Sequence, residues 1–254
     1  MGLDIYAGTL TRYYAKNWKT VTQQAAEKNN WGFQVIRPDE DESQPQDVVP
    51  VEQIQEHMQQ WSGMITTALF ADGDHEPWEE NNEKEYYTDK PDWCAFGALL
   101  LYGACLQYHL PIPQQIKKGW DYFEDSIVAR ALKDENFNWS LFTDAEWWLP
   151  FKEPVLFRCQ APNGVEITMG TTGDLLNELR KINELSWNAD DSTIVQWLET
   201  EGYPIDGEIV DGTYKILEIH TEYDVESLAK YAFSILYQAA LFSEKHGVPI
   251  IKDY

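Results

Sequence analysis

The hydrophobic positions change period along the chain, and the changes divide it into predicted strands and helices. Near the start, Leu3 and Ile5 alternate with polar neighbours, which predicts a half-buried strand over residues 3–10. The β-rich range 31–36 is its candidate partner, and Pro38 ends that range. We therefore expect the chain to open with a pair of strands.

Apolar residues then recur at helical spacing in three ranges. The first helix is expected from about 51 to 70. A second is expected over about 93–106, because Pro91 suits a first helical turn and Asp92 is favoured at its positive end. The same spacing over 114–133 predicts a third helix, packed antiparallel to the second.

The next segment carries the clearest strand signal. The ranges 155–159 and 165–169 are joined by a turn containing Asn163 and Gly164, which supplies the positive φ that a hairpin needs. Thr171 then precedes a helical stripe and is expected to cap it.

The last fifty residues combine short elements with one long helix. A short helix is expected near 193–200, and the range 214–219 is rich in β-forming residues. Asp224 caps a long helix that ends at Gly247, and the range 248–251 is expected to form an edge strand.

Helices and strands come in blocks without a repeating βαβ alternation. This order predicts an α+β fold in which an antiparallel or mixed β-sheet packs against helices. A length of 254 residues allows one core, so we expect a single compact domain over 1–254 with acidic, mobile loops near 38–50 and 72–90. The 11 Trp, 14 Tyr and 10 Phe supply large side chains for that core.

The charge changes this picture most. The formal net charge is −24, and it is concentrated in two segments. Residues 38–92 hold 16 acids and 2 bases, and residues 174–226 hold 14 acids and 3 bases. Nucleic acid is excluded as an expected partner, since its phosphates would be repelled.

Location is inferred from three weaker signals. The N-terminal residues show no basic stretch followed by an apolar run, which is the pattern of a secretory signal. The longest apolar run, 93–106, is shorter than the roughly 20 residues that span a membrane. The three cysteines fit a reducing compartment, so we expect a cytoplasmic protein without membrane contact.

One acidic window has the ligand spacing of a calcium loop. Carboxylates recur at alternating positions over 72–83, where the candidate ligands are Asp72, Asp74, Glu76 and Glu83. Its sixth position requires Gly and holds Pro77, whose fixed φ cannot make the turn. A solvated loop is favoured over a cation site.

Asp144 and Glu146 stand beside Trp147 and Trp148, and they are the candidate catalytic carboxylates. Glycosidases use two carboxylates, so this motif suggests an enzyme or binding protein for a small sugar or metabolite in a Trp-lined cleft. No phosphate-binding or dinucleotide motif is present, and no cofactor is expected.

The favoured hypothesis is a non-catalytic module that binds a basic protein, like an immunity or inhibitor protein. Acidic surfaces with aromatic anchors steer association with a cationic partner. The candidate contact residues are Asp39, Glu40, Asp41, Glu42, Trp78, Glu79 and Glu80. The oligomeric state stays open.

Overall fold

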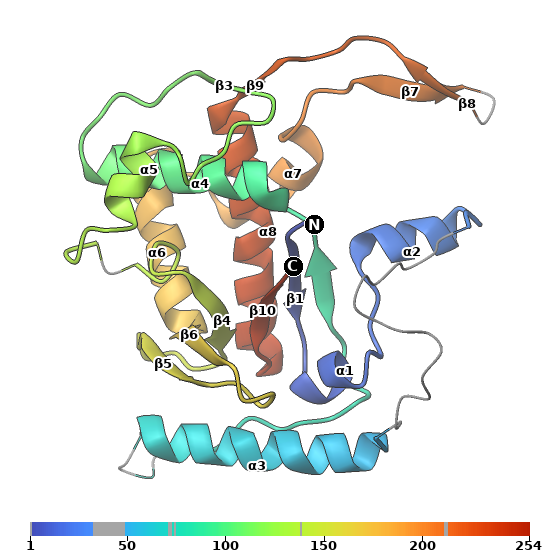
Figure 1. The fold of residues 1–254 in the computed structure, drawn as a ribbon, viewed down its shortest axis with the longest axis vertical. Helices are drawn as coiled ribbons and strands as arrows, with labels where there is room; N and C mark the ends of the chain where they lie inside the picture. Colours follow the sequence, from blue (N-terminus) through green and yellow to red (C-terminus); the bar gives the residue numbers. More distant parts are fainter. Residues whose placement is uncertain (1, 33–48, 71–72, 74, 138, 211–212) are drawn as a thin grey trace.

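The computed structural model describes residues 2–32, 49–70, 73, 75–137, 139–210 and 213–254 (Figure 1). The helices are α1 (Leu10–Tyr14), α2 (Val21–Lys28), α3 (Val51–Leu69), α4 (Asp92–Gln107), α5 (Ser126–Ala131), α6 (Thr172–Leu185), α7 (Asp191–Thr200) and α8 (Val225–His246). The strands are β1 (Asp4–Ala7), β2 (Tyr87–Asp89), β3 (Gln115–Lys117), β4 (Ala145–Leu149), β5 (Phe157–Gln160), β6 (Glu166–Thr171), β7 (Gly207–Val210), β8 (Thr213–Ile216), β9 (Glu222–Asp224) and β10 (Ile250–Asp253). The predicted α+β class is confirmed.

Six of these strands form one mixed sheet in the order β2-β1-β10-β4-β6-β5. β10 pairs antiparallel with both β1 and β4, while β4 and β6 are parallel. The expected edge strand at 248–251 is therefore an inner strand. Ile250 and Ile251 are both buried, as in strands that are covered on both faces.

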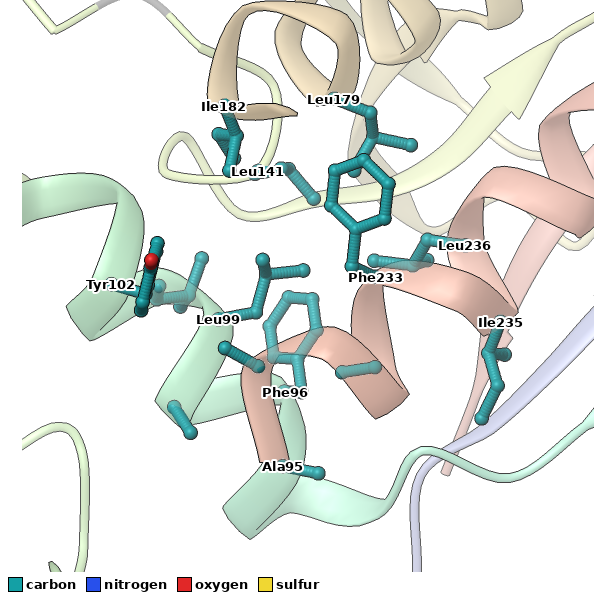
Figure 2. Packing of buried hydrophobic residues seen from close by; sticks show 14 of the residues in the cluster. Ala95, Phe96, Leu99, Tyr102, Leu141, Leu179, Ile182, Phe233, Ile235 and Leu236 are labelled. Carbon is teal, nitrogen blue, oxygen red and sulfur yellow. The ribbon is translucent and has the colours of Figure 1, made fainter. Parts of the chain in front are cut away.

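One face of the sheet is covered by α4, α8 and α6. α4 is buried from Ala95 through Cys105, which explains why its apolar residues show no single stripe. Figure 2 shows Phe96 and Leu99 of α4 beside Phe233 of α8, with Leu179 of α6 closing the same cluster. This is the larger of the two cores in the described residues.

The opposite face of the sheet packs against α3. Trp61 of α3 lies 5.9 Å, centroid to centroid, from Trp147 of β4, with the rings at 70°. The neighbouring Trp148 belongs to the core on the α4 side, because successive strand residues point to opposite faces. The two tryptophans therefore anchor two different cores.

The local signals at helix ends and turns are confirmed. The side chain of Thr171 accepts a hydrogen bond from the Asp174 amide, and that of Asp224 accepts one from Ser227. Gly247 ends α8 with φ 60°, and β5 and β6 form the expected antiparallel hairpin.

The helix expected over 114–133 is wrong. The segment begins as β3, which pairs with β9, and Gly119 turns the chain with φ 82°. The helix starts only at α5, where the Asp125 carboxylate accepts from the amides of Ile127 and Val128. Helical spacing of apolar residues cannot reveal a pairing with a strand a hundred residues away.

Two further observations concern the strands that pair with β1 and whether a helix could span a membrane. The partner strand expected at 31–36 lies largely outside the described residues, and β1 pairs with β2 and β10. Among the described helices, none combines the length and the apolar character needed to cross a membrane.

Gly173→Ala tests how closely α6 is packed. A Cβ at Gly173 would lie 1.9 Å from the carbonyl oxygen of Lys152, so we expect the unfolding free energy to fall by about 1–3 kcal/mol. The matched control is Gly63→Ala in α3, where no atom lies within 4 Å of the added Cβ. That change should raise the unfolding free energy by about 0.5–1 kcal/mol. Urea denaturation compares the two, and equal effects would contradict the close approach.

Candidate functional site

The candidate catalytic carboxylates lie at the start of β4, beside Lys252 of the central strand β10. The Lys252 Nζ atom is 3.6 Å from Oδ1 of Asp144. The Lys252 side chain is 3% exposed, whereas that of Asp144 is 81% exposed. Asp144 thus covers a buried ammonium from the solvent side, and Glu146 follows it at an irregularity in the strand register.

The surroundings of Lys252 explain its electrostatics. The Nζ atom lies 5.3 Å from the ring centroid of Phe96 and 5.9 Å from that of Trp148. Burial lowers the pKa of Lys252, and the charges of Asp144 and Glu146 oppose that change. Burial likewise raises the pKa of Glu146.

This cluster contains one ion pair, between Lys252 and Asp144, with Glu146 nearby. Trp147 and Trp148 are 6% and 0% exposed, so neither ring is available to stack on a sugar beside the carboxylates. The sequence analysis missed Lys252. The one available signal was its strand position, two residues from the buried Ile250 and hence on the same face.

Trp78 and Glu80, expected at a docking surface, are buried. The Glu80 carboxylate accepts hydrogen bonds from the Leu10 and Thr11 amides at 3.2 and 2.7 Å. It also accepts from the hydroxyl of Thr11 and from the indole N–H of Trp78, both at 2.8 Å. Glu80 therefore holds the first turn of α1 and the Trp78 ring inside the protein, away from any partner.

The other acidic candidates are placed as follows. Glu79 is exposed and its carboxylate lies 3.6 Å from the ammonium of Lys84. Glu76 and Glu83 are exposed. The candidates that lie outside the described residues are Asp39, Glu40, Asp41, Glu42, Asp72 and Asp74. Among the residues that are described, no group of three or more His, Cys, Asp or Glu side chains is arranged to hold a metal ion.

The two acidic segments do not share one face. Residues 75–86 lie along α3 at one end of the molecule, where Gln59 of α3 bonds both the amide of Glu80 and the carbonyl of Trp78. α7, β7 and β8 of the second segment lie at the opposite end (Figure 1). The segments touch where the Tyr203 hydroxyl donates to Asp92 at 2.6 Å.

The second segment contains the most exposed apolar surface of the described chain. β7 and β8 form a two-stranded sheet that projects from the body, and we call residues 205–210 and 213–219 the arm (Figure 1). In the described part of the chain, each of these strands pairs only with the other. Among the arm residues whose exposure is described, four large aliphatic side chains are 60–76% exposed: Ile205, Ile216, Leu217 and Ile219.

Acidic residues lie next to these apolar residues in the sequence. Glu218 is 73% exposed within the arm, and Glu222 and Asp224 are exposed just beyond it. Asp206 lies at the base, with its carboxylate 3.6 Å from the ammonium of Lys118. Exposed apolar side chains together with exposed acidic ones have the composition of a protein-binding surface. The arm is our candidate functional site.

A buried carboxylate lies on the other side of the molecule, on α6. Glu178 is 4% exposed and accepts from the Ser140 hydroxyl at 3.0 Å and the Leu141 amide at 3.1 Å. Burial, with a smaller contribution from Asp174, raises its pKa to about 8 despite these donors. Burial also raises the pKa of Asp174 to about 6.

Glu80→Gln tests the structural role of the Glu80 carboxylate. The amide nitrogen would face a donor, so we expect the unfolding free energy to fall by about 2–4 kcal/mol. Its neighbour provides the control, because Glu79 is exposed and Glu79→Gln should change stability by less than about 0.5 kcal/mol. Chemical denaturation measures both. An unchanged Glu80→Gln variant would return Glu80 to the list of surface candidates.

Glu178 predicts that stability falls as pH rises. The pKa of Glu178 is raised in the fold, so its contribution is fully present below about pH 4.5 and is lost as the pH approaches about 8. Between pH 6 and 8 the unfolding free energy should fall by up to about 1.4 kcal/mol per pH unit from Glu178, and Asp174, whose pKa is about 6, adds to this slope only near pH 6. Glu178→Gln should remove this dependence of the unfolding free energy on pH, even if the variant is more or less stable than the unchanged protein at every pH.

The control for this pH dependence is Glu184→Gln, an exposed position on the same helix. Denaturation midpoints of the three proteins at several pH values between 6 and 8 give the slopes. If Glu178→Gln and the unchanged protein have parallel curves, Glu178 is ionised in the fold throughout this range.

Comparison of this chain with known protein families, with curated proteins and with solved structures found no match. Its function is therefore argued from the geometry of its own residues.

Proposed function

We propose that the chain is a non-catalytic protein-binding module that docks a basic partner through the arm. The observation that carries this proposal is the exposure, at 60–76%, of Ile216 at the end of β8 and of Ile205, Leu217 and Ile219 in the segments that flank the two-stranded sheet. Isolated exposed aliphatic residues are ordinary on protein surfaces, but four on one arm form a patch that water contacts unfavourably. A partner that covers these side chains removes them from water, and this burial of apolar surface favours binding.

The chemistry of the partner follows from charge. Residues 174–226, which include the arm, hold 14 acids against 3 bases. Acidic surfaces attract cationic ones over about 10 Å at moderate salt, and this attraction raises the association rate. A partner with a basic rim around an apolar strip complements the arm in both respects.

The arm also offers a backbone mode of binding. Strands whose outer edges are unpaired present free N–H and C=O groups, and an extended segment of another chain pairs with such an edge. A basic protein whose substrate groove is cationic, such as a nuclease, fits this description. The chain would then act as an immunity or inhibitor protein.

The proposed location is the cytoplasm, and the state of the cysteines supports it. Cys94, Cys105 and Cys159 are all free, which suits a reducing compartment.

The test measures the binding of the full chain to a panel of basic nucleases by surface plasmon resonance. For at least one nuclease we expect binding that weakens as salt rises from about 0.05 to 0.5 M. The variant Ile216→Asn/Ile219→Asn should bind at least about tenfold more weakly, because it removes central apolar contacts.

The matched control is Met64→Asn/Val195→Asn, which changes two exposed apolar side chains outside the arm. It should bind like the unchanged protein. Charge is tested separately by Glu218→Gln/Glu222→Gln, which should lower the association rate more than it raises the dissociation rate. The proposal fails if no nuclease binds, or if the arm variant and the control weaken binding equally.

A further inference from the structure

A cavity of about 260 Å³ lies between α6, the loop at 150–152 and the last turn of α8. Apolar side chains, including Phe151 and Leu176, form part of its wall, and charged side chains of Lys152, Arg180 and Glu244 complete it. Small-ligand sites have this composition, with apolar walls and a few polar groups that orient the ligand.

The walls of the cavity are held by close contacts. The amide of Gly173 donates to the carbonyl of Phe151 at 2.9 Å, which ties the loop to the first turn of α6. Only glycine allows this approach, as a Cβ would overlap the carbonyl of Lys152. The hydroxyls of Thr172 and Ser243 lie 2.7 Å apart and join α6 to the end of α8. The cavity is therefore a feature of rigid elements.

The lining residues of α6 lie along one side of the helix. Gly173, Leu176, Asn177 and Arg180 follow the i, i+3, i+4, i+7 spacing of a single face. The first and last of these are separated by about 10 Å along the helix axis. Arg180 lies against the hydroxyl of Tyr237, which places it at the end of the cavity away from Thr172 and Ser243.

The charges around the cavity do not neutralise one another. Among the described residues, the side chains of Lys152 and Glu244 make no ion pair or hydrogen bond. Two cationic groups and one anionic group thus face one small space. Lys152, Arg180 and Glu244 are exposed to solvent as well as lining the cavity, so a ligand can reach their charged groups.

The geometry points to a binding site for an acidic α-amino acid. Such a ligand carries two carboxylates and one ammonium, which complement the two cations and one anion of the cavity. Its ammonium meets Glu244 and its α-carboxylate meets Lys152 at the first-turn end of α6. Its side-chain carboxylate reaches Arg180, whose planar guanidinium binds a carboxylate through two parallel hydrogen bonds.

The remaining lining residues fit the rest of this ligand. The methylene groups of the amino acid pack on Leu176 and Phe151, and the amide of Asn177 lies between the charged ends. This site lies at the end of α8, and the arm lies at the other end of the molecule (Figure 1). The inference is independent of the proposed partner.

Isothermal titration calorimetry of the full chain tests the site with four probes that differ by one charged group. They are L-glutamate, L-glutamine without the side-chain carboxylate, glutarate without the ammonium, and 4-aminobutanoate without the α-carboxylate. We expect L-glutamate to bind at least about tenfold more tightly than each of the others, because each lost contact is a charge-assisted hydrogen bond. The proposal is overturned if L-glutamate does not bind, or if glutarate or L-glutamine binds as tightly.

Two variants assign the contacts. Glu244→Gln should abolish the preference for L-glutamate over glutarate and keep the preference over L-glutamine. Arg180→Gln should do the reverse. Lys245→Gln, an exposed change next to Glu244 in α8, is the control and should leave all four affinities unchanged. Uniform weakening of every probe by Glu244→Gln and Arg180→Gln would refute the assigned geometry.

Discussion

The packing of α4 against α8 is the contact on which the rest of the structure depends. α4 is buried on all sides from Ala95 to Cys105, so it cannot exist outside a finished core. α8 supplies the matching surface through Phe233 and its neighbours (Figure 2). Gly247 then reverses the chain, so that β10 enters the centre of the sheet directly from this helix.

That insertion explains why polar groups near the chain ends become buried. Lys252 occupies an inward position of a central strand, and its ammonium is neutralised by Asp144 at the surface. Glu80 performs a related task on the other face, where it satisfies the amides that begin α1. Part of the large acidic charge is therefore internal and structural. Charge counts along a sequence overstate the acidity of the surface in such cases.

The sequence predicted the elements whose signals are local. The Thr171 and Asp224 caps, the Asn163-Gly164 turn and the helix of α3 depend on residues a few positions apart. The sequence-based prediction failed for elements whose structure depends on pairing with a segment distant in the sequence. Ile116 sits in a strand because β9 pairs with it, and Ile250 lies centrally because β1 and β4 flank it.

The candidate site shows the same limit. Trp78 and Glu80 resemble an exposed acidic aromatic motif until the pairing of Glu80 with Leu10 and Thr11 is known. The arm could be anticipated only as a β-rich range near 214–219, since exposure is a property of the whole fold. Asp144 and Glu146 lie near each other in the fold, but beside Lys252, for which strand position was the only signal in the sequence.

The stability of the arm bears on the proposed binding of a partner. An isolated two-stranded sheet is only marginally stable in water. If the arm were free to fluctuate, its ordering on binding would cost conformational entropy and lower the affinity. In this chain Asp206 stabilises the base of the arm. Its backbone carbonyl accepts hydrogen bonds from the amides of Leu217 and Glu218. Its carboxylate accepts one from the amide of His220. Tyr203, bonded to Asp92 and packed edge-on against Tyr223, joins that base to α4 and β9. The fold thus orders the root of the arm before any partner arrives. In the proposed complex, pairing of a partner strand with the edge of β7 or β8 would add backbone hydrogen bonds to those within the arm.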